Sequence, residues 1–148
     1  MKIEARTMLW TVDGDCSAEN FVNLLPLCWQ FDVAHGTFAQ FREPFLITTA
    51  PDLRDMTMIE LEEGSKVGLW GAVLTTGGWR AVDELEPRDR LVGVAYDVRQ
   101  ASASTRTSYR LSDIRATAVV TRISRQAGKW YTLRTDAILT VGGLLCRS

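Results

Sequence analysis

Three cysteines and one histidine are the residues of this 148-residue chain that could support nucleophilic catalysis. Cys16 lies in the stretch GDCS, at the expected start of a short helix, where the helix dipole lowers the pKa of a thiol. A thiol nucleophile also needs a base within hydrogen-bond reach, and His35 is the only histidine in the sequence. A Cys16–His35 pair is therefore one hypothesis. The alternative is that Cys16 is a partly buried structural residue and that His35 belongs to a surface turn.

Metal and cofactor sites are not expected. Cys16, Cys28 and Cys146 are odd in number and lack metal-binding spacing, which suits a reducing compartment. The stretch TTGGW lacks the strand, helix and Lys-Ser/Thr context of a phosphate-binding loop. An acidic cluster is mixed with arginines, as in a solvated, salt-bridged turn; it comprises Asp83, Glu84, Glu86 and Asp89 among Arg80, Arg88 and Arg90.

Basic residues in the last third of the chain form the other candidate site. They alternate with Tyr109, Trp130 and Tyr131, a composition typical of nucleic-acid-binding surfaces. Their spacing also fits one outward-pointing basic residue per strand, so nucleic-acid binding is an alternative and not the favoured interpretation. The candidate binding residues are Arg106, Arg110, Arg115, Arg122, Arg125, Lys129 and Arg134.

The net charge of −1 hides an uneven distribution along the chain. Residues 1–97 contain 16 acidic and 8 basic residues, whereas residues 98–148 contain 2 acidic and 9 basic residues. Such a split indicates either a basic surface or two faces of opposite sign that attract each other. We expect these faces to mediate self-association or contact with another protein.

The elements that must position these residues are mostly short strands. Residues 1–12 read as a first strand, and residues 16–26 as a short helix with Asp15 or Ser17 as its N-cap. A hairpin is expected around the stretch AHG, and residues 99–108 are expected to form an exposed loop. From Pro44 onward, β-type segments alternate with turn residues, which predicts an all-β fold, closed or strongly coiled.

Two stretches of the chain are nearly the same. AVLTTGGW at residues 72–79 and AILTVGGL at residues 137–144 share five identical residues in eight. Self-similarity of this kind predicts either a pseudo-symmetric fold or two ordinary edge hairpins. We expect the strands at 72–76 and 137–141 to occupy equivalent positions, and Trp79 to be partly buried after its Gly-Gly turn.

The order of these segments resembles the Hint superfamily, the hedgehog and intein autoprocessing domains. The resemblance rests on FLITTAPDLRDMTMIELEEGSKV, on AVLTTGGWRAVDELEPRDRLVGV and on the closing stretch VTRISRQAGKWYTLRTDAILTVGGLLCRS. It implies a pseudo-twofold β horseshoe over residues 37–148, with a strand–helix–strand segment at residues 1–36. That fold would account for the repeated octapeptide.

The resemblance also implies three catalytic positions, and each is vacant here. The family's first residue, a cysteine or serine that attacks the preceding carbonyl, is expected near Thr37–Phe41, which contain no cysteine. The histidine that polarises the scissile amide is expected at or near Gly71, and glycine has no side chain to donate a hydrogen bond. The terminal His-Asn, which cyclises to release the following segment, corresponds to Arg147 and Ser148. Autoprocessing is therefore not expected.

The favoured function is a non-catalytic Hint-like module that serves as a structural or protein-interaction component of a larger assembly, such as a phage or mobile-element particle. The alternatives are a self-cleaving or thiol-dependent hydrolase that uses Cys16, and a nucleic-acid-binding β protein. The charged N-terminus and the absence of an eighteen-residue apolar run predict no signal peptide and no membrane span. A cytoplasmic or virion-associated protein is expected.

Overall fold

The computed structural model describes residues 1–41, 46–47, 51–101 and 106–148. Most of these residues lie in strands, so the predicted all-β class is confirmed. The helices are short: α1 (Ala18–Leu24), α2 (Tyr96–Gln100), α3 (Leu111–Ile114) and a 3-10 turn, η1 (Val82–Glu84). The strands are β1 (Lys2–Glu4), β2 (Met8–Thr11), β3 (Gly14–Ser17), β4 (Cys28–Asp32), β5 (Thr37–Phe41), β6 (Leu46–Ile47), β7 (Asp52–Leu61), β8 (Lys66–Trp70), β9 (Ala72–Thr75), β10 (Gly78–Ala81), β11 (Arg90–Val94), β12 (Ser108–Arg110), β13 (Arg115–Arg134), β14 (Ile138–Val141) and β15 (Leu144–Arg147).

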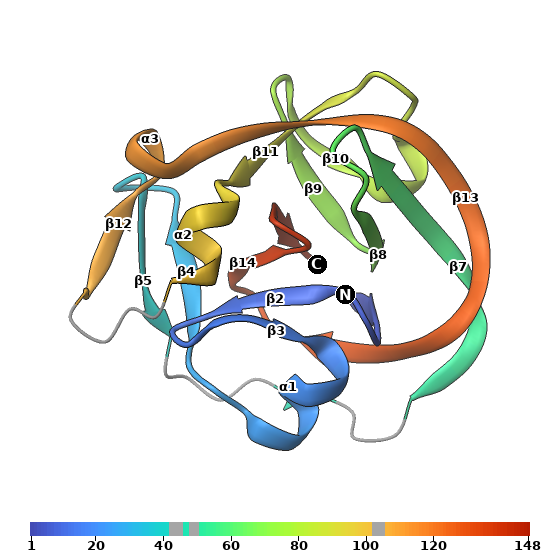
Figure 1. Cartoon of the computed structure of the whole chain (residues 1–148), viewed down its shortest axis with the longest axis horizontal. Coiled ribbons are helices and arrows are strands. Elements are labelled where there is room, and N and C mark those ends of the chain that lie inside the picture. The colour runs from blue at the N-terminus through green and yellow to red at the C-terminus, as the bar shows by residue number, and fades with distance from the viewer. Residues whose placement is uncertain (42–45, 48–50, 102–105) are drawn as a thin grey trace.

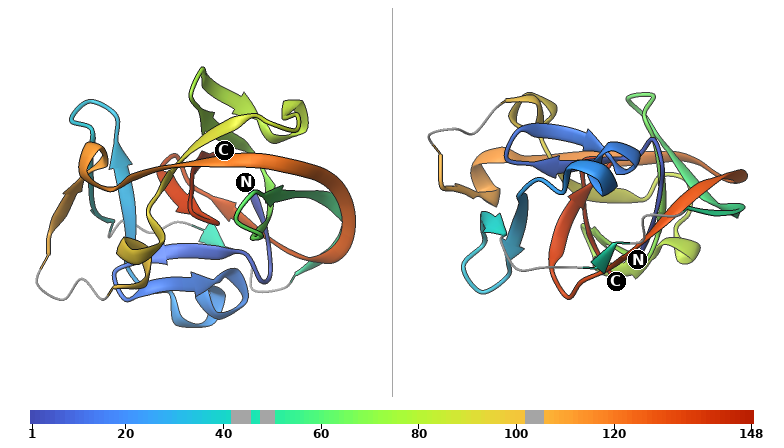
Figure 2. Two further views of the ribbon diagram at one scale, coloured as in Figure 1. Left: turned by 45° about the horizontal axis from the view of Figure 1, so that its top comes forward. Right: turned by 90° about the horizontal axis from the view of Figure 1, so that it is seen from below.

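The strand β13 joins the two parts of the sheet. Along its length it pairs in turn with β11, β7, β1 and β6. Because β1 also pairs with β8, and β8 with β7, the strands β1, β8, β7 and β13 close into a ring. From β11 the sheet continues through β9, β15, β14, β2, β4, β5 and β12. Figure 1 shows β13 as a long arc around one side of the molecule, and both views in Figure 2 show the same curl.

The curvature of β13 has a local cause. The register between β13 and β7 shifts between Val120 and Arg122, where one residue is left out of the pairing. An irregularity of this kind bends a strand and increases its twist. The bend separates the part of β13 that pairs with β11 from the part that pairs with β7. A single strand therefore belongs to both parts of the sheet.

The first 36 residues and the remainder share this sheet. β1 pairs with β13 and β8, and β2 pairs with β14. Within the first segment, Ser17 is the N-cap of α1, and its hydroxyl accepts a hydrogen bond from the backbone N–H of Asn20 at 3.2 Å. The expected hairpin is formed by β4 and β5. Through these pairings, the predicted segment of residues 1–36 and the strands of residues 37–148 belong to one sheet.

The two copies of the repeated octapeptide form adjacent hairpins with different turns. β9 and β10 are joined at Thr75 and Gly78, so the loop is Thr76–Gly77. β14 and β15 are joined at Val141 and Leu144, so the loop is Gly142–Gly143, with φ of +59° and +81°. Both central residues of that loop have positive φ, which glycine adopts without steric cost. The loops therefore differ by one residue when the two sequences are aligned.

The one-residue difference reverses the buried side of the strand. Val73 is fully buried and Leu74 partly buried, whereas the aligned Ile138 is partly buried and Leu139 is fully buried. A shift of one residue exchanges the two faces of a strand. β9 and β15 are neighbours in the sheet, but the predicted equivalence of the two octapeptides does not extend to their turns or their buried faces.

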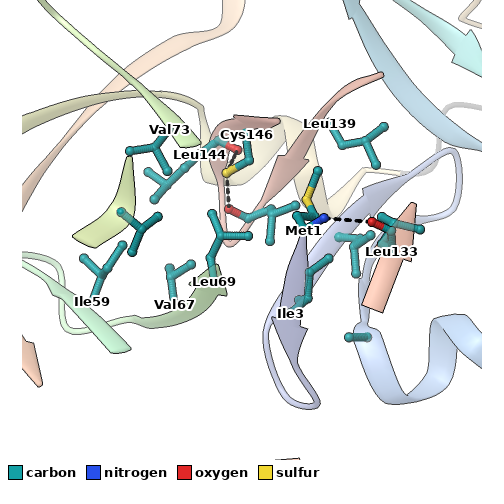
Figure 3. Close-up of a cluster of buried hydrophobic side chains, with 14 of the residues drawn as sticks. Met1, Ile3, Ile59, Val67, Leu69, Val73, Leu133, Leu139, Leu144 and Cys146 are labelled. Atoms are coloured by element: carbon teal, nitrogen blue, oxygen red, sulfur yellow. Dashed lines mark hydrogen bonds between the residues drawn. The ribbon is translucent and has the colours of Figure 1, made fainter. Parts of the chain in front are cut away.

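The main hydrophobic core fills the interior of the curled sheet. Figure 3 shows Met1, Ile3, Leu69, Leu133 and Cys146 gathered there from different strands. The Met1 ammonium donates a hydrogen bond to the Leu133 carbonyl oxygen at 2.9 Å, and the Cys146 thiol donates to the Leu144 carbonyl oxygen at 3.3 Å. Segments from both ends of the chain thus complete one core.

A second cluster is aromatic and lies between β2, β4, β5 and β12. The rings of Trp10 and Trp29 stack with centroids 5.3 Å apart, and Phe38 and Tyr109 contact Trp10 at 5.3 and 5.4 Å. Aromatic pairs in this range contribute beyond the area that they bury. Trp79 is partly buried against this cluster, which confirms the prediction for that residue.

A buried ion pair connects β3 to α2. Arg99 and Asp15 have side chains only 9% and 6% exposed, and Arg99 Nη1 lies 2.6 Å from Asp15 Oδ2. Arg99 Nε also donates to the carbonyl oxygen of Val94 at 3.0 Å, and the Gln100 amide donates to Asp15 Oδ2 at 3.0 Å. Burial raises the pKa of Asp15, while Arg99 and Gln100 act in the opposite direction. Removing one partner of such a pair leaves the other charge buried and uncompensated.

We expect the Asp15→Ala substitution to lower the free energy of unfolding by about 3–5 kcal/mol, because it leaves the Arg99 charge buried alone. The matched double variant Asp15→Leu/Arg99→Met removes both charges. Its free energy of unfolding should fall by less than that of Asp15→Ala. Urea unfolding followed by tryptophan fluorescence measures both. Equal losses in the two variants would contradict this account of the pair.

The aromatic cluster gives a second prediction. Trp29 is fully buried, so Trp29→Ala should lower the free energy of unfolding by about 3–5 kcal/mol. Leu24→Ala at the exposed end of α1 is the control and should change it by less than about 0.5 kcal/mol. Thermal unfolding followed by circular dichroism compares the two, and similar melting temperatures would contradict the prediction.

Candidate functional site

The candidate site is a pocket where the first residue, the last residue and the start of β9 meet. The pocket has a volume of about 400 Å³ and is lined mainly by apolar atoms. Its lining residues are Met1, Trp70, Gly71, Ala72, Ala81, Asp83 and Ser148. β1, β8, β9 and β15 bring these residues together, because β1 pairs with β8 and β15 pairs with β9.

Hydrogen bonds hold the two chain ends at this pocket. The Met1 ammonium donates to the Ser148 hydroxyl at 3.2 Å, and that hydroxyl donates to the Thr135 carbonyl oxygen at 3.2 Å. Burial, followed by the nearby charge of Lys2, lowers the pKa of the Met1 amine. Asp83 Oδ1 accepts a hydrogen bond from the Thr57 hydroxyl at 3.1 Å. The polar groups of the pocket are thus engaged in hydrogen bonds, either with one another or with Thr57 and Thr135 beside it.

Gly71 is packed closely against the residues around it. A Cβ atom added at Gly71 would lie 2.7 Å from the carbonyl oxygen of Arg147 and 3.2 Å from the Cβ of Met1. The first of these distances is shorter than side chains tolerate, and the obstructing atom belongs to the backbone. No side chain fits at Gly71 unless β15 moves.

Arg147 directs its side chain away from Gly71. Its guanidinium lies over the Trp79 ring, with Cζ 4.4 Å from the ring centroid, which is a favourable cation–π distance. Its backbone pairs with Ala72 of β9. Arg147 therefore stabilises the β9–β10 hairpin from outside the pocket.

Comparison with known proteins identifies the fold. No protein-family model and no curated protein sequence matches the chain. Solved structures do match. The DnaX mini-intein of Spirulina platensis has a TM-score of 0.71 at 10% sequence identity and covers 100% of both chains. The DnaB intein of Synechocystis sp. has a TM-score of 0.65 at 13% identity, over 99% of this chain and 97% of that one. A bacterial intein-like domain from Clostridium thermocellum has a TM-score of 0.64 at 11% identity, over 99% of this chain and 98% of that one.

The protein therefore has the Hint fold, and the predicted resemblance is confirmed at the level of fold. The residues expected near the family's first position do not line the pocket. Thr37–Phe41 form β5, which pairs with β4 and β12, whereas Met1 lies in the pocket beside Gly71 and Ser148. Met1 was not among the candidate residues, because a thioether carries no chemical signal of a nucleophile.

The three cysteines lie in β strands and are not arranged for catalysis. Burial raises the pKa of Cys28 to about 12 and that of Cys146 further above its ordinary value. Burial, followed by the charge of Asp15, also raises the pKa of Cys16. A reactive thiol needs the opposite shift.

His35 is engaged in its own turn. Its Nδ1 lies 2.6 Å from Asp32 Oδ2, and three-quarters of its side chain is exposed. This contact lowers the pKa of Asp32. The hypothesis of a Cys16–His35 pair gains no support from these contacts, since Cys16 lies in β3 and its thiol contacts the Ser17 carbonyl oxygen.

All seven candidate basic residues are exposed, but they are spread over the molecule. Arg106 and Arg110 flank or lie in β12, and the others follow the arc of β13 from its first residue to its last. Figure 1 shows that the two ends of β13 lie on opposite sides of the molecule. Some are engaged locally: Arg106 lies over the Tyr109 ring at 4.5 Å, and Arg122 lies 3.7 Å from Glu60. Nucleic-acid binding by these residues stays a prediction.

The acidic stretch around η1 behaves as a turn. Asp89 Oδ2 accepts a hydrogen bond from the backbone N–H of Glu86 at 2.8 Å and lies 3.4 Å from Arg80. These contacts close the loop between β10 and β11. Within the part of the chain that the structure describes, no helix is long and apolar enough to cross a membrane.

Steric crowding at Gly71 is testable. Gly71→Ala should lower the free energy of unfolding by about 1–3 kcal/mol, because the added methyl group meets the Arg147 carbonyl. Gly77→Ala is the matched control, since its added Cβ would come no closer than 3.7 Å to the atoms around it. Chemical unfolding measures both variants. A Gly71→Ala protein as stable as Gly77→Ala would show that the pocket relaxes without cost.

The buried thiol of Cys28 predicts a pH dependence. Its pKa is about 12 in the folded protein and 9.0 in the unfolded chain, so the unfolded state loses the proton first. The contribution of this thiol to the free energy of unfolding is therefore fully present below about pH 9 and falls as the pH rises toward 12. The slope from this one group is about 1.4 kcal/mol per pH unit. Unfolding under reducing conditions from about pH 9 to about pH 11 should show a shallower slope in Cys28→Ala than in the unsubstituted protein. Equal slopes would contradict the assignment.

Proposed function

We propose that this protein is a Hint-fold module that does not autoprocess and that serves as a structural or protein-interaction component of a larger assembly. The observation that carries the proposal is the packing of Gly71 against the Arg147 carbonyl oxygen at the point where the chain ends meet. The resemblance places a histidine at or near this position, and an imidazole has no room at Gly71.

The neighbouring residues support the same conclusion. An acyl shift at the first residue needs a thiol or hydroxyl that can accept the acyl group, and Met1 offers only a thioether. Release at the last residue requires a carboxamide that can cyclise, and Ser148 has a hydroxyl that is already hydrogen-bonded to the Thr135 carbonyl oxygen. Removing the members of a catalytic group that act together costs orders of magnitude in rate.

The proposal is tested by placing reporter domains before Met1 and after Ser148 and following the purified fusion by intact mass spectrometry. An intact fusion after prolonged incubation is expected, both with and without added thiol. Cleavage at either junction would contradict the proposal. A fusion carrying Cys16→Ala is the matched control, because fragments that disappear in this variant would identify the thiol-dependent alternative.

An interaction role is supported by exposed apolar side chains next to charged ones. Trp70 of β8 and Leu53 of β7 are more than half exposed. Part of the uneven charge is neutralised within the molecule, since Arg99 pairs with Asp15 and Arg122 with Glu60. The remaining charges would orient a partner, while apolar contact would supply most of the affinity.

We expect self-association or capture of a partner that weakens as salt rises, because charge interactions at exposed sites are screened beyond about 8–10 Å at physiological ionic strength. Size-exclusion chromatography with light scattering across a salt series measures the mass directly. Trp70→Ser should reduce the association at every salt concentration. A monomer under all conditions would contradict self-association and leave a different protein as the partner.

A further inference from the structure

A second site lies away from the chain ends, at the first turn of α2. Two pockets of about 440 and 420 Å³ share four lining residues, namely Glu63, Tyr96, Arg99 and Gly142. They therefore form one groove that crosses α2. On one side the groove is bounded by β13 and β11, and on the other by β2 and the start of β8. We call it the Arg99 groove.

Arg99 is at the base of this groove and keeps one nitrogen unpaired. Its Nε donates to the Val94 carbonyl oxygen and its Nη1 to Asp15. Nη2 has no hydrogen-bond partner within residues 1–41, 46–47, 51–101 and 106–148. The fully buried nitrogens without a partner in these residues belong to tryptophans, so Nη2 retains accessible surface. Nη2 is therefore able to donate to water or to a ligand in the groove.

The backbone is shaped to admit this guanidinium. A Cβ added at Gly143 would lie 2.9 Å from Arg99 Cζ and 3.0 Å from Nη2. Glycine at this position of the β14–β15 turn therefore lets the planar group lie directly against the chain. With Nε and Nη1 both fixed, the orientation of Nη2 is set before any ligand arrives, which reduces the entropy lost on binding.

The walls of the groove carry charges of both signs at one end. Tyr96 is 63% exposed, and its ring lies 5.6 Å from Arg99 Cζ. Arg6, Lys66 and Ser65 line the same end. The acidic groups there are Asp15, which is paired with Arg99, and Glu63, which accepts a hydrogen bond from the Ser65 hydroxyl. Arg6 and Lys66 contact Glu4 and Glu60 but are more than half exposed, and this leaves their ammonium and guanidinium groups able to turn toward a ligand.

We propose that the Arg99 groove binds a carboxylate group, with Arg99 Nη2 as its fixed anchor, Lys66 as a second cation and Tyr96 as a wall. Arginine is suited to this role because its planar donors match the geometry of a carboxylate. The carboxylate comes either from an acidic side chain of a protein partner or from a small free acid. This site is separate from the pocket at Met1, so it can fail while the proposed non-processing module stands, and the reverse is also true.

The test is an NMR titration of the isotope-labelled full chain, read at the Arg99 Nε–H signal and at the amides of Ser65, Tyr96 and Gly142. The probes are acetyl-Gly-Glu-Gly-amide, its uncharged counterpart acetyl-Gly-Gln-Gly-amide, and sodium acetate. The glutamate peptide should shift these signals with millimolar affinity, and the glutamine peptide should bind at least about tenfold more weakly. If acetate binds as tightly as the glutamate peptide, the ligand is a small acid. If acetate binds more weakly than the peptide, the ligand is a carboxylate of a peptide partner.

Four substitutions test which side chains bind the glutamate peptide. Lys66→Gln and Tyr96→Ala alter exposed side chains and should each weaken binding of the glutamate peptide about three- to tenfold without changing the melting temperature. Arg99→Lys should abolish it, and if that variant does not fold, the other two still decide. Arg134→Gln, at the far end of β13, is the matched control and should leave binding unchanged. The proposal is overturned if no signal shifts at up to about 50 mM peptide, if the glutamine peptide binds equally well, or if Arg134→Gln has the same effect as Lys66→Gln.

Discussion

The pairing of β13 with four other strands is the constraint on which the rest of this structure depends. Residues 115–119 pair with β11, residues 120–130 with β7, residues 130–132 with β1 and residues 133–134 with β6. All four pairings are antiparallel, and a long strand that twists with its neighbours does not stay flat. It bends at the irregularity between Val120 and Arg122 and carries the sheet around with it. The ring of β1, β8, β7 and β13 is closed by the residues of β13 that follow this irregularity.

The site at the chain ends is a consequence of this closure. β1 is held between β8 and β13, which places Met1 in the interior beside Leu133. β15 is held beside β9, which places Ser148 and the Arg147 carbonyl against Gly71. The fold thus brings together three points that are distant in the sequence. What they can do depends on their side chains, and here those are a thioether, a hydrogen atom and a hydroxyl. The Hint architecture is complete, and the pocket within it is apolar.

Burial of charge is a second feature of the molecule, at Arg99 and Asp15. A buried ion pair is costly to desolvate and seldom increases stability over an apolar pair of similar volume. Here the pair connects β3, α2 and the β14–β15 turn, and it leaves a guanidinium nitrogen facing a groove. The geometry at Arg99 is the reason to look for a ligand at α2 and not only at the chain ends.

The sequence by itself determined the class of fold and much of its local structure. Alternating apolar residues and turn residues predicted the strands, Ser17 was one of two expected caps for α1, and the Gly-Gly pairs marked two hairpins. The order of segments was sufficient to recognise the Hint fold. Each of these features depends on neighbouring residues or on a linear pattern.

Only the tertiary structure decided which residues meet. Met1 was not among the candidate residues, because nothing in a linear pattern reveals that it is buried beside Leu133 or that Thr37–Phe41 pair with β12. Arg99 was assigned to an exposed loop, since its local sequence is small and polar, whereas its burial depends on Asp15, 84 positions earlier in the chain. The two octapeptides look alike, yet their turns differ by one residue, because the neighbouring strands and not the octapeptides themselves decide which face is buried.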